Sequence, residues 1–129
     1  MTEIKRPYEI PIPLSNYVNL IRERKSPYWD IVRYLLKDME IYYKRGDRSE
    51  VIYTINPRML QKELEDRIKH EKVTRTNVCR TILALFYGSE LEEGEDFFIT
   101  TSARGRKNYH VKLSSKTFSA MKNFVPGIL

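Results

Sequence analysis

The sequence of 129 residues has a single cysteine, Cys79, and no long apolar run. One cysteine cannot form an internal disulfide, and it excludes a cysteine-rich zinc site. Because no stretch of about 18 apolar residues is present, we expect no segment to span a membrane. The first residues, MTEIKRPYEIPIPL, also lack the apolar core of a secretory signal. We therefore expect an intracellular protein, in the cytoplasm or nucleoid or in a virus-infected host cell.

Signatures of common enzymes are missing as well. The chain has no glycine-rich phosphate loop, no GxSxG and no HExxH. The acidic stretch from Glu90 to Asp96 lacks the ligand spacing of a calcium loop. We therefore expect a protein that is not an enzyme, with no catalytic residues, no metal site and no cofactor.

Acidic residues are absent from residues 97–129, whereas the whole chain carries a net charge of +6. The basic residues of this segment are Arg104, Arg106, Lys107, Lys112, Lys116 and Lys122. Directly before it stands an acidic block made of Glu90, Glu92, Glu93, Glu95 and Asp96. Charge that is segregated in this way indicates one face that meets phosphates and another that does not.

Glutamine is nearly absent, since Gln61 is the only one, while Lys, Arg, Glu, Ile and Tyr are plentiful. This bias resembles proteins of heat-loving organisms, in which charged networks replace labile amides. AT-rich coding is an alternative explanation, because it also enriches Ile, Lys and Tyr. We expect an archaeal or viral source.

Prolines divide the start of the chain from the rest. Pro7, Pro11 and Pro13 predict that residues 1–14 form an extended arm, because proline fixes φ and lacks a backbone donor. A short helix is expected from Ser15 up to the basic residues at 22–25. We therefore expect two parts, an arm with a short helix at 1–25 and a folded domain at 26–129.

Within 26–129, capping residues mark three helices around one strand. Ser26-Pro27 and Asn56-Pro57 each place a capping side chain before a proline, which favours a helix start. Apolar residues at spacings of three and four extend the first helix towards Gly46. The β-branched run 51–55 predicts a strand. The second helix is expected at about 57–70, and Thr74 caps a third at 74–87.

After Gly88 the apolar period changes from helical to two. Residues 97–101 and 109–113 therefore predict two strands, and the loop between them contains Gly105 and three cations. This pattern is typical of a β-hairpin with a basic tip. Ser114 or Ser115 begins a last helix that ends near 124.

This order of elements resembles that of the winged helix-turn-helix family over residues 26–124. The resemblance implies an α+β fold with a three-helix core and a β-hairpin wing, here with an N-terminal arm and a C-terminal helix. In that family the third helix, here 74–87, enters the major groove, and the wing, here 97–113, lies beside the minor groove or along a backbone. The resemblance therefore implies binding of double-stranded DNA and a role in transcription regulation. It does not separate a repressor from an activator.

The side chains of helix 74–87 suit that role. Arginine bonds guanine O6 and N7 together, asparagine bonds adenine N6 and N7, and threonine reaches a phosphate or a thymine methyl. The predicted DNA-binding residues of this helix are Arg75, Thr76, Asn77, Arg80 and Thr81, all expected opposite its apolar stripe. Those of the wing tip are Arg104, Arg106 and Lys107, and Lys69 and Lys72 flank the turn before the helix. The plainer reading, that Thr74 and Asn77 only cap the helix and the cations are solvated, stays open.

Two other functions also fit the sequence. A winged helix can serve as a protein-interaction module in an assembly, with the groove helix as its contact surface. Residues 93–97, Tyr109, Leu113 and the closing helix are similar to the tail half of phage antirepressor-like modules. For the DNA-binding function we expect a possible homodimer through the arm and first helix, because many such proteins read paired half-sites.

Overall fold

The computed structural model describes residues 11–45 and 51–126. Over these two ranges the chain forms five helices and three strands and belongs to the α+β class, as the sequence predicts. The elements are α1 (Ile12–Arg22), α2 (Tyr28–Arg45), β1 (Val51–Ile55), α3 (Pro57–Arg67), α4 (Arg75–Gly88), β2 (Phe97–Thr101), β3 (Lys107–Leu113) and α5 (Ser115–Phe124). No helix within the described ranges has the length and apolar character needed to cross a bilayer.

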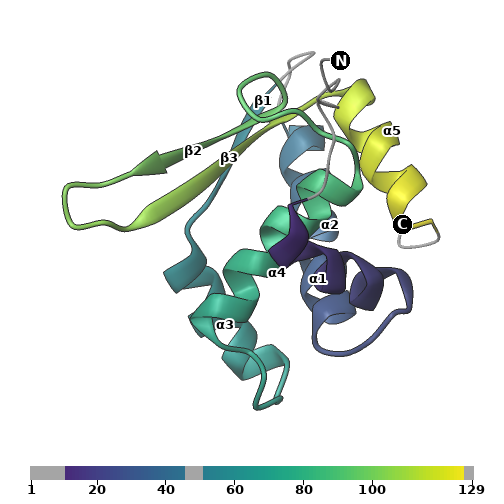
Figure 1. The fold of residues 1–129 in the computed structure, drawn as a ribbon. Coiled ribbons are helices and arrows are strands. Elements are labelled where there is room, and N and C mark those ends of the chain that lie inside the picture. Colours follow the sequence, from purple (N-terminus) through teal and green to yellow (C-terminus); the bar gives the residue numbers. More distant parts are fainter. Residues whose placement is uncertain (1–10, 46–50, 127–129) are drawn as a thin grey trace, which may run out of the picture.

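The three strands form one antiparallel sheet in the order β1-β3-β2. Val111 of the central strand pairs with Tyr53 on one side and Phe97 on the other. Strands β2 and β3 form the predicted hairpin, which extends well beyond the helices (Figure 1). Its tip is closed by bonds from the Ser102 amide to Arg106 O at 2.8 Å and from the Gly105 amide to Ser102 O at 2.9 Å. Gly105 has φ +78°, which a glycine adopts without steric cost.

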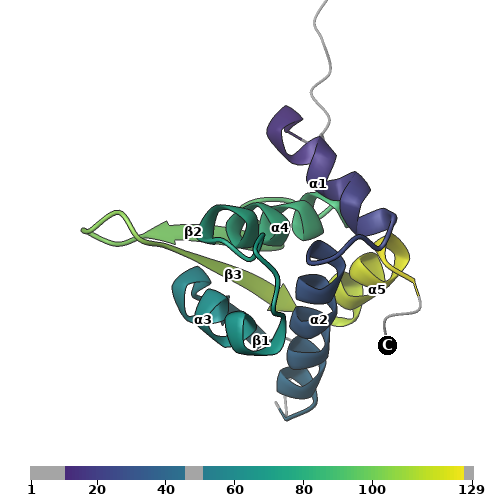
Figure 2. The same ribbon diagram turned by 90° about the horizontal axis from the view of Figure 1, so that it is seen from below.

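Helix α4 lies at the centre of the helices, and each of the other four contacts it (Figure 2). Its buried stripe includes Val78, Ile82 and Leu85, which are fully inaccessible to solvent. The inward side chains of β3 complete the same core. Because α4 is packed from several directions, only its first turns and one narrow side remain available to a partner.

Side-chain caps begin three helices where the sequence places them. Asn56 accepts hydrogen bonds from the amides of Arg58 and Met59, and Thr74 accepts one from the amide of Asn77. Ser114 and Thr117 form a reciprocal capping box at the start of α5. These caps satisfy amides that the helices leave unpaired, so they fix where each helix begins.

The N-terminal part differs from the prediction. Helix α1 begins at Ile12, so residues 12–14 are helical rather than part of an extended arm, and residues 1–10 lie outside the described residues. Pro13 fits because the first turn of a helix needs no intrahelical amide donor. Val18 and Ile21 are buried in the main core, so the expected boundary at residue 25 does not separate α1 from the domain. The apolar face of α1 is thus occupied within the chain, and the homodimer through the arm and first helix stays a prediction.

Smaller differences concern helix and strand ends. The Ser26 hydroxyl donates to Asp30 Oδ2 at 2.7 Å instead of capping backbone amides, and α2 begins at Tyr28. Helix α3 ends at Arg67 rather than near 70, and β3 begins at Lys107 rather than at 109. Gly46, the predicted stop of α2, lies outside the described residues.

Candidate nucleic-acid interface

A cavity of about 240 Å³ lies where the first turns of α3 and α4 face the end of the hairpin. It is lined by Asn56, Pro57, Arg58, Arg75, Cys79, Gly105, Arg106 and Lys107, and we call it the basic groove. Arg75 and Lys107 are far apart in the chain, and the fold brings them to one hollow. The two cationic segments that the sequence singles out, the start of helix 74–87 and the wing tip, therefore meet.

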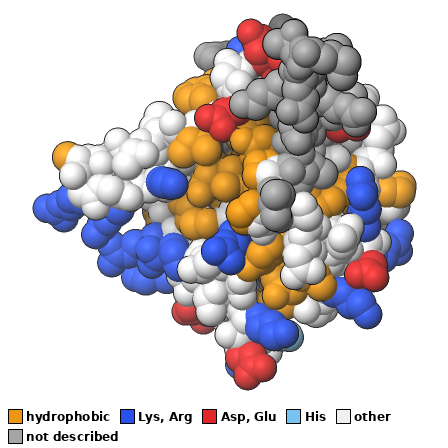
Figure 3. All heavy atoms as spheres, in the orientation of Figure 1, with side chains coloured by type: hydrophobic (Ala, Val, Ile, Leu, Met, Phe, Trp, Pro, Cys, Tyr) orange, Lys and Arg blue, Asp and Glu red, His pale blue; other side chains and the backbone are white. Residues whose placement is uncertain are grey.

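Positive charge continues from the groove along the hairpin. Figure 3 shows Lys and Arg side chains gathered on the hairpin and beneath it, at the left of the view, and no acidic side chain on the hairpin. Arg104, Arg106 and Lys107 are all exposed. Arg104 does not line the groove, so it extends the positive surface outwards from it.

Arg75 is exposed at the first position of α4 and is held by a neighbour on α3. Its Nε donates to Gln61 Oε1 at 2.9 Å, and Gln61 Nε2 in turn donates to Glu65 Oε1 at 3.2 Å. Thr76 beside it is exposed. The start of α4 thus presents a cation, a hydroxyl and the positive end of the helix to the solvent.

Both polar atoms of the Asn77 side chain are already hydrogen-bonded within the chain, which disfavours the expected contact with a base. Its Oδ1 accepts a hydrogen bond from the Tyr17 hydroxyl at 2.7 Å, and its Nδ2 donates to Lys72 O at 2.8 Å. Asn77 therefore fastens the turn before α4 to α1. Arg80 is exposed, and its guanidinium lies 5.8 Å from the Tyr17 ring centroid with Nη1 donating to the Tyr17 hydroxyl at 3.4 Å.

The expectation that Thr81 lies on the exposed side with Arg80 is wrong. Thr81 is fully buried, and its hydroxyl donates to Asn77 O at 2.6 Å. It stands three residues after Val78 and four before Leu85, so it belongs to the apolar stripe. The bond to the carbonyl four residues earlier satisfies its hydroxyl inside the core.

Lys69 and Lys72 are exposed in the segment between α3 and α4 but do not line the basic groove. The Lys72 amide donates to His70 Nδ1 at 3.1 Å, which helps to fix this turn.

Sequence reasoning missed three residues of this region. Arg58 lines the groove, Gln61 orients Arg75, and Tyr17 bonds Asn77 and Arg80. Arg58 could have been found, because it lies in the first turn of a helix whose start is clearly marked by Asn56-Pro57. Nothing in the pattern of residues points to Tyr17 or Gln61, since their contacts depend on which helices pack together.

The acidic block forms local contacts at the other end of α4. Asp96 is buried and accepts hydrogen bonds from the Glu92 amide at 2.9 Å and from Lys116 Nζ at 3.4 Å. Tyr87 donates to Glu93 Oε1 at 3.1 Å, and burial together with that bond raises the pKa of Tyr87. Among the described residues, no three His, Cys, Asp or Glu side chains are placed to hold a metal ion.

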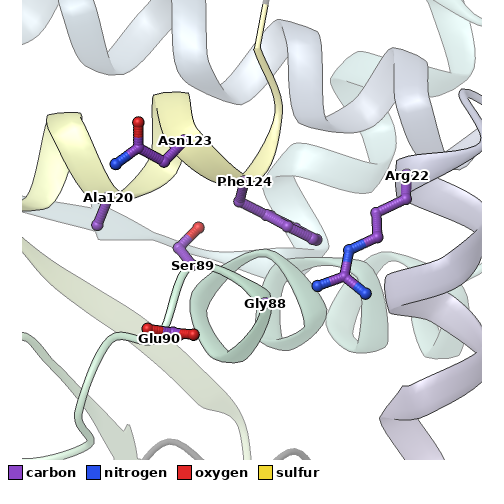
Figure 4. A pocket seen from close by; sticks show the side chains of 7 residues that line it. All are labelled: Arg22, Gly88, Ser89, Glu90, Ala120, Asn123 and Phe124. Atoms are coloured by element: carbon purple, nitrogen blue, oxygen red, sulfur yellow. The ribbon is translucent and has the colours of Figure 1, made fainter.

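A second cavity, of about 330 Å³, lies at the C-terminal ends of α1, α4 and α5. Figure 4 shows the Phe124 ring over Gly88, with Glu90 and Arg22 on either side. The Arg22 guanidinium lies 5.4 Å from the Phe124 ring centroid. This cavity is separated from the basic groove by the length of α4.

No protein-family model matches the chain, and neither a curated protein nor a solved structure matches it.

Proposed function

We propose that the chain is a winged helix-turn-helix protein that binds double-stranded DNA, with α4 in the major groove and the β2–β3 hairpin as its wing. The order of elements from α2 to β3 agrees with that family. The proposal includes a role in transcription regulation, which follows from the resemblance alone.

The single observation that carries the proposal is the basic groove. It joins Arg75 of α4 to Arg106 and Lys107 of the hairpin in one hollow, and its lining also includes Arg58 and no acidic residue. A duplex is a rod of closely spaced phosphates, so it is attracted to cations that lie together on an extended surface. A hairpin that extends beyond the helices lengthens this surface.

The contacts divide into two kinds. In this proposal Arg75 and Thr76, at the exposed start of α4, contact base edges, and the amides of the first turn bind a phosphate. The hairpin cations, with Arg80, Lys69 and Lys72 as outer contacts, neutralise phosphates, and Arg104 at the tip suits a narrow minor groove. Thr81 is buried and Asn77 is engaged in the turn, so neither belongs to the proposed contact set.

Three charge-removing variants test this division. Arg75→Ala should lower affinity for a selected duplex by about 1–3 kcal/mol and relax the choice of sequence, whereas Lys107→Ala should weaken binding to all duplexes alike and make the salt dependence shallower. Lys122→Ala removes the same charge from α5, outside the groove, and is the matched control. Gel-shift titrations at several salt concentrations measure all three.

Two results would contradict the proposal. If the intact chain binds no duplex even at low salt, the protein-interaction module becomes the better reading. If Arg75→Ala and Lys107→Ala reduce binding to selected and random duplexes equally, the assignment of base and phosphate contacts is wrong.

A further inference from the structure

The guanidinium of Arg75 is already oriented before any partner binds. Its Nε donates to Gln61 Oε1 at 2.9 Å, and Gln61 is half-buried and itself bonded to Glu65. Within the described residues, this is the only hydrogen bond or ion pair that Arg75 makes through its side chain. An arginine has five N–H donors in a planar fork, so fixing Nε leaves the four donors of the two terminal nitrogens.

We infer that Gln61 is a positioning residue, and that it holds Arg75 so that its two terminal nitrogens read a guanine in the major groove. This inference rests on the proposed function and specifies the base that the site recognises. Guanine presents two acceptors, O6 and N7, side by side on its major-groove edge, whereas adenine places a donor beside N7. A guanidinium that donates from both terminal nitrogens to one base edge therefore finds two adjacent acceptors only on guanine.

Preorganisation explains why the neutral Gln61 matters. A free arginine side chain loses rotamer freedom when it binds, and a side chain that is already held loses less. Gln61 adds no charge towards the phosphates, so its effect should appear in base preference and not in salt dependence. That difference separates a positioning role from a contribution to the DNA contact itself.

The experiment uses the full chain and a duplex that it selects from a random pool. Each guanine of that duplex is replaced in turn by 7-deazaguanine, which lacks the N7 acceptor. For the unchanged protein, we expect one replacement to weaken binding by up to about tenfold, because it removes one of the two acceptors of the bidentate contact and leaves O6 in place. For Arg75→Ala the same replacement should have no further effect.

Gln61→Ala should reduce the sensitivity to that guanine several-fold while the salt dependence stays as in the unchanged protein. The double variant Gln61→Glu/Glu65→Gln exchanges the two bonded side chains of α3 and keeps an acceptor for Arg75, so it should retain the sensitivity. Met59→Ala is the control, because Met59 is a neutral α3 residue with 69% of its surface exposed. Thermal unfolding of each variant shows that the fold is retained.

The outcomes separate the two proposals. A chain that binds no duplex at low salt overturns the proposed function and this inference with it. A chain that binds DNA but tolerates 7-deazaguanine at every position, or keeps its full sensitivity in Gln61→Ala, overturns only the inference.

Discussion

Gly88, the last residue of α4, offers a quantitative test of the packing at the C-terminal end of that helix. A Cβ added there would lie 2.4, 2.6 and 2.7 Å from three carbons of the Phe124 ring (Figure 4). Carbon atoms normally approach to about 3.5–4 Å, so the ring must retreat by about an ångström or more. Overpacking of this kind costs about 1–3 kcal/mol, and the displaced ring also weakens its contact with Arg22.

The opposing effect is helix propensity. Alanine is favoured over glycine by about 1 kcal/mol inside a helix and by less at its last residue. We therefore expect Gly88→Ala to destabilise the protein by about 1 kcal/mol net. In a Phe124→Ala background the ring is gone, and the same change should be neutral or stabilising. Urea unfolding of the unchanged protein, the two single variants and the double variant gives the free energies of unfolding for this double-mutant cycle. If Gly88→Ala has the same effect in both backgrounds, the ring does not occupy the space above Gly88.

Two further changes test other parts of the fold. Glu90 has φ +60° just after α4 and places an acid at the negative end of that helix, so Glu90→Gly should raise stability by about 1 kcal/mol and the melting temperature with it. Arg24→Gly is the control, because Arg24 has a similar φ but also lies over Trp29 and donates a hydrogen bond to Pro126 O. An equal gain in stability from both changes would contradict the reasoning. Burial and a hydrogen bond with Glu63 raise the pKa of the Tyr34 hydroxyl in the folded protein to about 12. Below the ordinary tyrosine pKa of 10.0, the neutral hydroxyl therefore contributes its full stabilisation of the folded state. This contribution is lost as the pH rises towards 12. Near-ultraviolet titrations of the unchanged protein and of Tyr34→Phe should differ by one tyrosinate step at high pH. If that step instead lies near the ordinary pKa of 10.0, the prediction is refuted.

Local chemistry predicts much of this fold. Asn56, Thr74 and Ser114 each bond the amides that open a helix, and a capping side chain acts within a few residues of itself. The change of apolar period after Gly88 likewise marks a hairpin that the structure contains. Such features need no knowledge of what packs against them, so they can be read from one sequence.

Features that depend on packing were not predictable in the same way. The bonds that join Tyr17 to Asn77 and Gln61 to Arg75 link different helices, and the sequence does not say which helices touch. Thr81 shows the limit within one helix. A threonine at the edge of an apolar stripe can face either side, and the bond to Asn77 O lets this one enter the core.

The charges of the chain are arranged along α4, and this arrangement bears on how DNA would dock. The helix has 14 residues and is therefore about 20 Å long, with Arg75 and the basic groove at its first turn and Glu90 two residues past its end. The helix dipole is positive at the first turn and negative at the last, so it has the same sense as the side-chain charges.

A phosphate backbone is then attracted to one end of α4 and repelled from the other. Because the separation exceeds the screening length of about 8 Å at physiological salt, each end acts on its own part of a duplex. The acidic block would thus limit docking to the end of α4 that carries Arg75, so neutralising Glu92 and Glu93 should increase binding to random duplexes more than binding to a selected one.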